Sequence, residues 1–177
     1  AIGFWDRAAL IALPPSMRHA AGPRREIGIR TVFNILGPLT NPARAQRQLI
    51  GIADPFLGDK MARVLNLMGS QRALVVHGDD GLDEVTLGST PHAWEVKDGA
   101  VDSYSISPED MGLPRVPIEQ IVGGTKEENA ATLRRVLQGA PGPIRDVVLA
   151  NAAAVLMVGG KAENLREGVE AARKAID

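Results

Sequence analysis

The chain has 177 residues, which is enough for one domain with its own hydrophobic core. Its net charge is −1, so no basic field favours nucleic acid, and we expect no nucleic-acid partner. The chain contains no cysteine, which excludes disulfides and thiolate metal sites, and it has no apolar run long enough to span a bilayer. These features favour a cytoplasmic protein with no membrane partner.

The first part of the chain alternates between helical and strand patterns. In chain order we expect a helix around 32–36, a strand over 48–52, a helix over 55–68, and strands over 72–77, 93–96 and 101–106. Asp54-Pro55 predicts the start of the second helix, since aspartate caps helices well and proline suits their first position. A turn at Lys97-Asp98-Gly99 is expected to connect the last two strands.

The second part is mainly helical. Ser107–Asp110 indicates a short helical turn, and Thr125-Lys126-Glu127-Glu128 is a capping box that predicts a helix through Leu137. Further helices are expected over 143–158 and 162–176. This order predicts an α/β fold, with a largely parallel sheet and flanking helices, and ligands at the carboxyl ends of the strands.

An arginine-rich segment precedes a rigid bend. Arg24, Arg25 and Arg30 lie within seven positions, followed by the bend at Gly37-Pro38 and Asn41-Pro42. A guanidinium matches a carboxylate through two parallel hydrogen bonds, so the segment is a candidate site for a planar carboxylate ligand. The alternative is a solvated helix face, because exposed charges are common.

An acidic loop, Asp79 to Glu84, directly follows the expected strand over 72–77. Carboxylate oxygens are ligands that hard divalent cations prefer, and the end of a buried strand is where ligands gather. Asp83 and Glu84 are therefore candidate metal ligands. Asp79 and Asp80 are expected to shape the turn, because aspartate accepts hydrogen bonds from its own nearby backbone.

Four segments, in order and spacing, resemble anthranilate phosphoribosyltransferases. They are Arg24 to Ala43, Val75 to Glu84, Gly123 to Ala130, and Asn151-Ala152-Ala153-Ala154. The resemblance implies part of the large α/β domain of the phosphoribosyltransferase and nucleoside phosphorylase type. It also implies transfer of phosphoribose from phosphoribosyl diphosphate to the amine of anthranilate, in tryptophan biosynthesis, with help from Mg²⁺.

The resemblance also implies roles for individual residues. Arg24 would bind the anthranilate carboxylate, and Pro38 would line the anthranilate channel. Asp83 and Glu84 would hold magnesium near the diphosphate. The partners implied are these small-molecule substrates and, for a full-length protein, a second copy in a homodimer.

The chain departs from the family in its first residues. Residues 1–13 match no family segment, residues 14–177 match the C-terminal part of the catalytic domain, and Pro14 stands where the family has histidine. The family's glycine-rich diphosphate loop and Lys-His-Gly-Asn segment are not in this sequence. We therefore expect no transfer by these 177 residues alone. An inactive family-like paralogue, a binding protein and a nucleoside phosphorylase stay open as alternatives.

Other polar residues have structural interpretations. We expect His77, at the end of the strand over 72–77, to be a packed, hydrogen-bonded histidine rather than a base. Gly123-Gly124 is expected to be a turn before the Thr125 cap rather than a phosphate loop. Asn129 and Asn151 are expected to make packing or inter-element hydrogen bonds.

Overall fold

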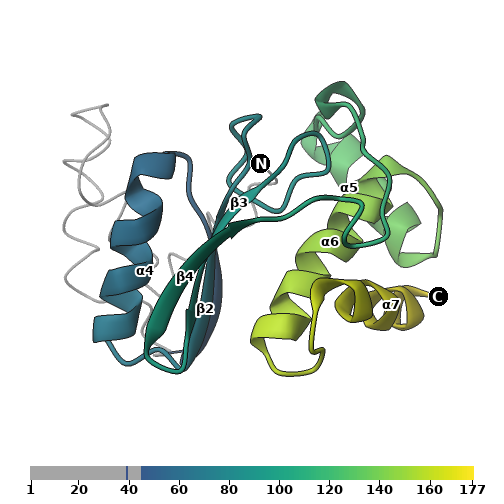
Figure 1. The fold of residues 1–177 in the computed structure, drawn as a ribbon. Helices are drawn as coiled ribbons and strands as arrows, with labels where there is room; N and C mark the ends of the chain where they lie inside the picture. Colours follow the sequence, from purple (N-terminus) through teal and green to yellow (C-terminus); the bar gives the residue numbers. More distant parts are fainter. Residues whose placement is uncertain (1–38, 40–44) are drawn as a thin grey trace, which may run out of the picture. The chain divides into compact units, whose positions relative to one another are not determined.

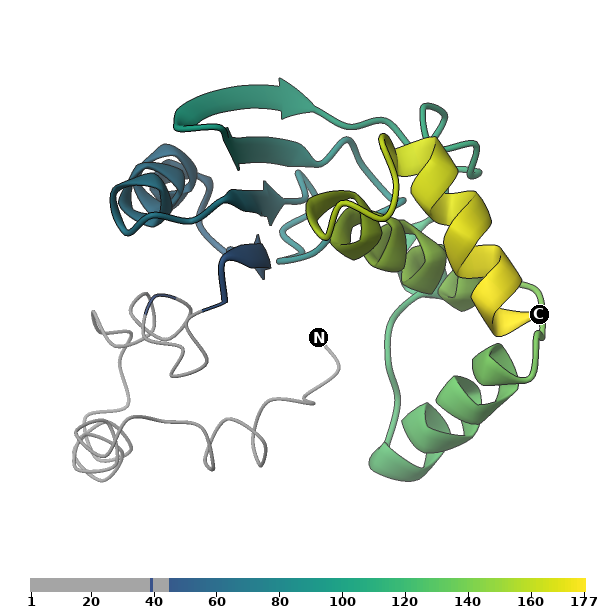
Figure 2. The same ribbon diagram turned by 90° about the horizontal axis from the view of Figure 1, so that it is seen from below.

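Residues 45–177 form a four-stranded sheet with helices on both faces (Figure 1). These residues and residue 39 are the ones that this computed structural model describes. The strands are β1 (Arg47–Gly51), β2 (Arg72–His77), β3 (His92–Lys97) and β4 (Ala100–Ser105). They lie side by side in this order, from the dark blue β1 to the teal β4 in Figure 2. The helix expected around 32–36 lies outside the described residues.

The sheet is mixed within residues 45–177. β1 and β2 are parallel, whereas β2–β3 and β3–β4 are antiparallel. We expected a largely parallel sheet, and the difference arises because the predicted hairpin joins the sheet at β2. At the hairpin turn, Asp98 has φ 51° and Gly99 has φ 81°, the two positive values that a tight two-residue turn requires. The α/β class with flanking helices is confirmed.

Helices cover both faces of the sheet. α4 packs on β2, β3 and β4, whereas α6 packs on β1 and β2 from the other side and carries α7 on its flank (Figure 1). Among the described residues, no helix has the length and apolar character needed to cross a membrane. The helical elements and their bounds are η1 (Pro55–Leu57), α4 (Gly58–Leu67), η2 (Ile118–Gln120), α5 (Lys126–Leu137), α6 (Pro143–Val158) and α7 (Leu165–Ile176).

Side-chain caps determine where two of the helices begin. Thr125 and Glu128 form the predicted capping box, and α5 starts and ends where the sequence indicates. α7 starts at Leu165, three residues later than expected, because the side chain of Asn164 accepts a hydrogen bond from the Glu167 N–H at 2.9 Å. Ser107–Asp110 begins the predicted short helical turn, in which the Asp110 N–H donates to the Ser107 carbonyl at 3.2 Å and the Met111 N–H to the Pro108 carbonyl at 3.1 Å.

The main core lies between the sheet and the α6–α7 pair. β2 is buried on both faces, and Leu74 and Val76 point to this core while alternate residues face the α4 side. Small residues let α6 and α7 approach closely. A Cβ on Gly168 of α7 would lie 2.8 Å from the Cα of Ala153, so a larger residue there would separate the two helices.

Two arginines connect the sheet to the end of α6. Arg47 and Arg72 begin the parallel strands, and each donates a hydrogen bond to a carbonyl in the last turn of α6, Val158 at 2.9 Å and Met157 at 2.7 Å. Cations stabilise the C-terminal end of a helix, where the carbonyls lack intrahelical partners. These bonds set α6 antiparallel to β1 and β2, so its N-terminal half points toward the edge where those strands end.

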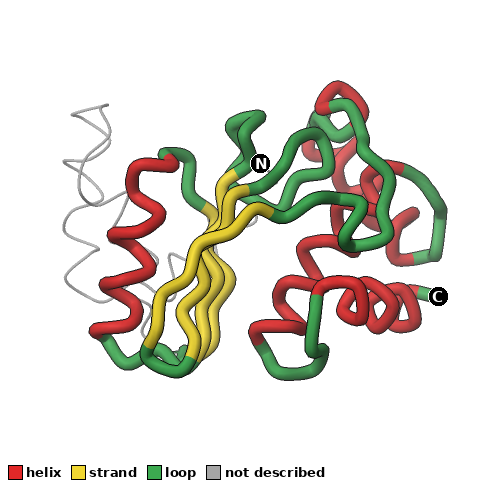
Figure 3. Tube along the Cα trace, in the orientation of Figure 1, coloured by secondary structure: helices red, strands yellow, loops and turns green. Residues whose placement is uncertain are grey.

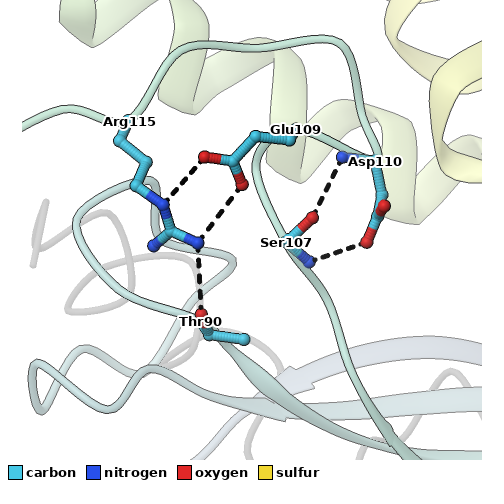
Figure 4. A network of polar contacts seen from close by, with 5 residues as sticks. All are labelled: Thr90, Ser107, Glu109, Asp110 and Arg115. Atoms are coloured by element: carbon cyan, nitrogen blue, oxygen red, sulfur yellow. Dashed lines mark hydrogen bonds and ion pairs between the residues drawn. The ribbon is translucent and has the colours of Figure 1, made fainter.

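The segment after β4 is braced by its own polar side chains (Figure 4). Arg115 binds the Glu109 carboxylate with its Nε at 2.8 Å, and Ser107 and Asp110 exchange two side-chain-to-backbone hydrogen bonds. A backbone hydrogen bond and the pairing with Arg115 lower the pKa of the Glu109 carboxyl. Hydrogen bonds with Ser107 lower the pKa of the Asp110 carboxyl. Both lowered pKa values stabilise the folded segment at pH values above the ordinary pKa of a carboxyl group. This contribution is lost as the pH falls from that ordinary pKa through the lowered one.

Arg72→Met should destabilise the fold by about 3–5 kcal/mol, because it leaves the largely buried carboxylate of Glu95 without its cation. Arg72 pairs with Glu95 at 2.7 Å, and both side chains are only 14% exposed. Urea unfolding followed by circular dichroism measures the loss. The control is Arg63→Met, which breaks an exposed ion pair with Asp59 and should change little. Equal stability of both variants would contradict a stabilising role for the Arg72–Glu95 ion pair.

Candidate functional site

The acidic loop lies at the edge of the sheet where β1 and β2 end. The register pairs Gly51 with Val76, and the Ile52 N–H donates to the Val76 carbonyl at 3.0 Å, so the two strands end together. In Figure 3 the long loops, drawn in green, leave the strands at this edge, opposite the short β3–β4 turn. The structure thus places Asp83 and Glu84 at the carboxyl ends of the parallel strands, as the sequence predicts.

Asp80 has a structural role in this loop. Its Oδ1 accepts a hydrogen bond from the Leu82 N–H at 3.2 Å, and its Oδ2 accepts one from the Thr86 hydroxyl at 2.6 Å. Thr86 is fully buried, and its oxygen in turn accepts the Gly88 N–H at 3.0 Å. Both carboxylate oxygens of Asp80 are therefore occupied within the loop, which confirms the predicted turn-shaping role.

Asp83 and Glu84 differ from Asp80 in having no hydrogen-bond partner among residues 45–177. Asp83 is exposed and Glu84 is half-buried. Burial raises the pKa of Glu84, and the neighbouring charges of Asp83 and Asp80 raise it further. Both causes disfavour the charged form of Glu84, whereas a nearby cation would favour it. Asp83 and Glu84 are therefore available as acceptors, as is the exposed carboxylate of Asp79, for which residues 45–177 also provide no hydrogen-bond partner, so a turn-shaping contact is seen for Asp80 and not for Asp79.

His77, the last residue of β2, is a packed histidine. It is 7% exposed, and its Nδ1 lies 2.8 Å from the Ile52 carbonyl oxygen. Since a carbonyl only accepts, Nδ1 carries the proton and donates it. This bond ties the end of β2 to the residue after β1, and it confirms the structural interpretation of His77.

The Gly123-Gly124 segment is a loop that bonds to the first turns of α5. The Gly124 N–H donates to Asn129 Oδ1 at 2.8 Å, and Asn129 Nδ2 donates back to the Gly124 carbonyl at 3.1 Å. The Thr125 N–H donates to Glu128 at 2.7 Å. These backbone donors already have partners, which confirms the predicted Thr125 cap, whereas the segment before it forms no turn.

The expected anthranilate residues, Arg24 and Pro38, lie outside the described residues, as do Arg25 and Arg30. Their placement beside the acidic loop therefore stays a prediction. A feature that the sequence did not identify is the partner of Asn151, whose side chain binds both backbone groups of Val85. Neither residue's neighbours indicate this contact, because it joins residues 66 positions apart.

The two carboxylates Asp83 and Glu84 fit a hard cation that takes most of its ligands from water and substrate. No group of three or more histidine, aspartate or glutamate side chains converges within the described residues. Mg²⁺ in proteins is commonly bound by one or two carboxylates, with water and substrate phosphates completing six oxygen ligands. Asp83 and Glu84 can supply that protein share.

Thr86→Val should destabilise the loop and the fold by roughly 1–3 kcal/mol, because it removes the hydroxyl that satisfies Asp80 while preserving the volume. Thermal unfolding measures this loss. Thr86→Ser is the matched control, since it restores the hydroxyl and should recover most of the hydrogen-bond energy. Wild-type stability in the valine variant would show that Asp80 does not depend on Thr86.

Comparison with known proteins identifies the family of this chain. The family described as "Glycosyl transferase family, a/b domain" matches residues 11–177. The anthranilate phosphoribosyltransferase of Symbiobacterium thermophilum is 55% identical over 166 residues, which are 94% of this chain and 49% of that protein. The enzyme of the same name from Thermomicrobium roseum is 54% identical over 92% of this chain and 48% of its own length.

Solved structures show the same relationship. The anthranilate phosphoribosyltransferase of Thermus thermophilus has a TM-score of 0.83 and 46% identity, over 92% of this chain and 48% of that one. The Saccharomyces cerevisiae enzyme in complex with PRPP and Mg has a TM-score of 0.80 and 29% identity, over 90% of this chain and 46% of its own. The same enzyme has been solved with 4-fluoroanthranilate. The chain spans about half the length of these relatives, and it belongs to the glycosyl transferase α/β-domain family, in which its relatives are named anthranilate phosphoribosyltransferases.

Proposed function

We propose that this chain is the magnesium-binding part of an anthranilate phosphoribosyltransferase, which transfers phosphoribose from phosphoribosyl diphosphate to the amine of anthranilate. The observation that carries the proposal is the pair of available carboxylates, Asp83 and Glu84, at the end of β2. The yeast relative, solved with PRPP and Mg, supports the use of that cation and that substrate.

The chemistry of the reaction requires such a pair. Breaking the bond between ribose C1 and the diphosphate builds negative charge on the leaving group and positive charge on the sugar. Asp83 and Glu84 would hold Mg²⁺, which as a Lewis acid stabilises negative charge on phosphate oxygens. Neither carboxylate needs to act as a base, because the amine of anthranilate is already nucleophilic and mainly needs to be positioned.

The anthranilate end of the site is assigned to residues before the described part. Arg24 would pair with the anthranilate carboxylate through two hydrogen bonds, and Pro38 would form one wall of the channel. The yeast relative bound to 4-fluoroanthranilate supports a ligand of this kind. As further parts of the proposal, the protein acts in the cytoplasm within tryptophan biosynthesis, and at the length of its relatives it is a homodimer.

A chimera tests the proposed function. Residues 14–177 replace the matching half of the Thermus thermophilus relative, so that the remaining half comes from that protein. Loss of anthranilate fluorescence that requires both phosphoribosyl diphosphate and Mg²⁺ would support the proposal. A folded chimera that consumes no anthranilate would refute it. Circular dichroism and gel filtration establish that the chimera is folded.

Asp83→Asn combined with Glu84→Gln should remove most of the magnesium dependence of transfer, because the amides lack the negative charge of the carboxylates through which proteins bind Mg²⁺. Initial rates of the chimera, measured across a magnesium titration, give the result. Glu109→Gln is the control, since it neutralises an exposed carboxylate outside the acidic loop. If the double variant still responds to magnesium as the unsubstituted chimera does, other groups hold the metal.

Arg24→Ala should raise the KM for anthranilate by about 10- to 100-fold, the equivalent of about 1.5–3 kcal/mol for a hydrogen bond to a charged group. The KM for phosphoribosyl diphosphate should change far less, because only anthranilate presents a carboxylate to this arginine. Steady-state kinetics on the chimera measure both constants. An unchanged anthranilate KM would remove Arg24 from the site.

A further inference from the structure

We propose that Gly51 and Asn151 are positioning residues for the Asp83–Glu84 pair, because they hold the loop backbone from two sides. This inference rests on the proposed role of Asp83 and Glu84 as metal ligands. Gly51 ends β1, and Asn151 lies in the middle of α6. Neither side chain is itself a metal ligand.

Asn151 fixes the backbone directly after Glu84. Its Oδ1 accepts the Val85 N–H at 3.0 Å, and its Nδ2 donates to the Val85 carbonyl at 2.9 Å. A third hydrogen bond, from Nδ2 to the Val147 carbonyl at 3.0 Å, holds the amide against its own helix. Val85 is fully buried, so removing the amide deprives both of its backbone groups of their partners.

Gly51 lets the loop backbone at Asp83, one residue before Glu84, lie directly against the end of β1. A Cβ on Gly51 would lie 1.6 Å from the carbonyl oxygen of Asp83 and 2.5 Å from its carbonyl carbon. The obstructing atoms belong to the backbone, so no side-chain rotation makes room for a methyl group. Any larger residue at position 51 must therefore displace Asp83, which means that the loop contacts the end of β1 only because this residue is glycine.

The two contacts lie on either side of Glu84 in the chain, and each connects the loop to a regular secondary-structure element. Gly51 belongs to a strand paired with β2, and the C-terminal end of α6 is bound to the starts of the same two strands by Arg47 and Arg72. A displacement of about 1 Å at a reacting group can cost about 100-fold in rate. Placing the carboxylates between the sheet and a fixed helix limits such displacement.

The chain contains a matched control for Asn151. Asn129 makes the same two-way amide contact with a single backbone residue, Gly124, through bonds of 2.8 and 3.1 Å. That contact lies between α5 and the loop before it and does not include the acidic loop. Removing either amide deletes the same kind of interaction, but only Asn151 bears on Asp83 and Glu84.

The experiment measures Mn²⁺ binding to the 177-residue chain by electron paramagnetic resonance. Asn151→Ala should weaken Mn²⁺ binding by about 10-fold or more, as is typical when a residue that orients a metal ligand is lost. Gly51→Ala should weaken it in the same direction, and it supplies a second variant if Asn151→Ala does not fold. Asn129→Ala should leave the Mn²⁺ affinity unchanged. Thermal unfolding of each variant separates affinity from stability.

The outcomes distinguish this inference from the proposed function. If Asp83→Asn with Glu84→Gln leaves Mn²⁺ affinity unchanged, the metal assignment fails and this inference fails with it. If that double variant loses binding while Asn151→Ala and Gly51→Ala bind Mn²⁺ as tightly as the wild type, only the positioning roles are overturned. Loss of affinity in both positioning variants, with Asn129→Ala unaffected, supports the proposal.

Discussion

The backbone of residues 83–85 is held where a strand, a helix and a loop meet, and the candidate site depends on this constraint. On one side, Asp83 lies against a glycine that leaves no room for a side chain. On the other, Val85 gives both of its backbone hydrogen-bonding groups to Asn151. The backbone of Glu84 lies between these two contacts. Two carboxylates, for which residues 45–177 provide no hydrogen-bond partner, are thus kept adjacent at the end of β2.

The acidic residues of the loop divide into two kinds. Asp80 uses both oxygens inside the loop, accepting the Leu82 N–H and the buried Thr86 hydroxyl, and so fixes the turn. Asp79, Asp83 and Glu84 have no side-chain hydrogen-bond partner among residues 45–177, and we propose the last two as metal ligands. The negative charge of Asp80 nevertheless acts on its neighbours, since it contributes to the raised pKa of Glu84. A cation is the kind of ligand that such an arrangement favours.

Elements with local signals could be predicted from the sequence. The capping box at Thr125 and the run over 72–77 predicted α5 and β2 with their bounds, because both signals lie within the segments themselves. The start of α7 was placed too early because the Asn164 cap decides it. The mixed sheet was not expected, because strand direction depends on where the hairpin joins.

The candidate site likewise has parts that the sequence predicts and parts that it does not. The position of Asp83 and Glu84 after a buried strand could be predicted, as could the turn-shaping role of Asp80. The contacts of Gly51 and Asn151 with the loop could not, because they join residues that only the packed sheet and α6 bring together. Asn151 looks like one more residue in an alanine-rich helix until its partner is known.

The most direct test of this account follows the amide signals of the isotopically labelled protein by NMR during a titration with Mn²⁺. The account predicts that the signals of residues 82–86 broaden first, and that this selectivity disappears when Asp83 and Glu84 are replaced by their amides. Broadening centred on another acidic segment, such as Glu109-Asp110, or broadening that is indifferent to those replacements, would contradict it.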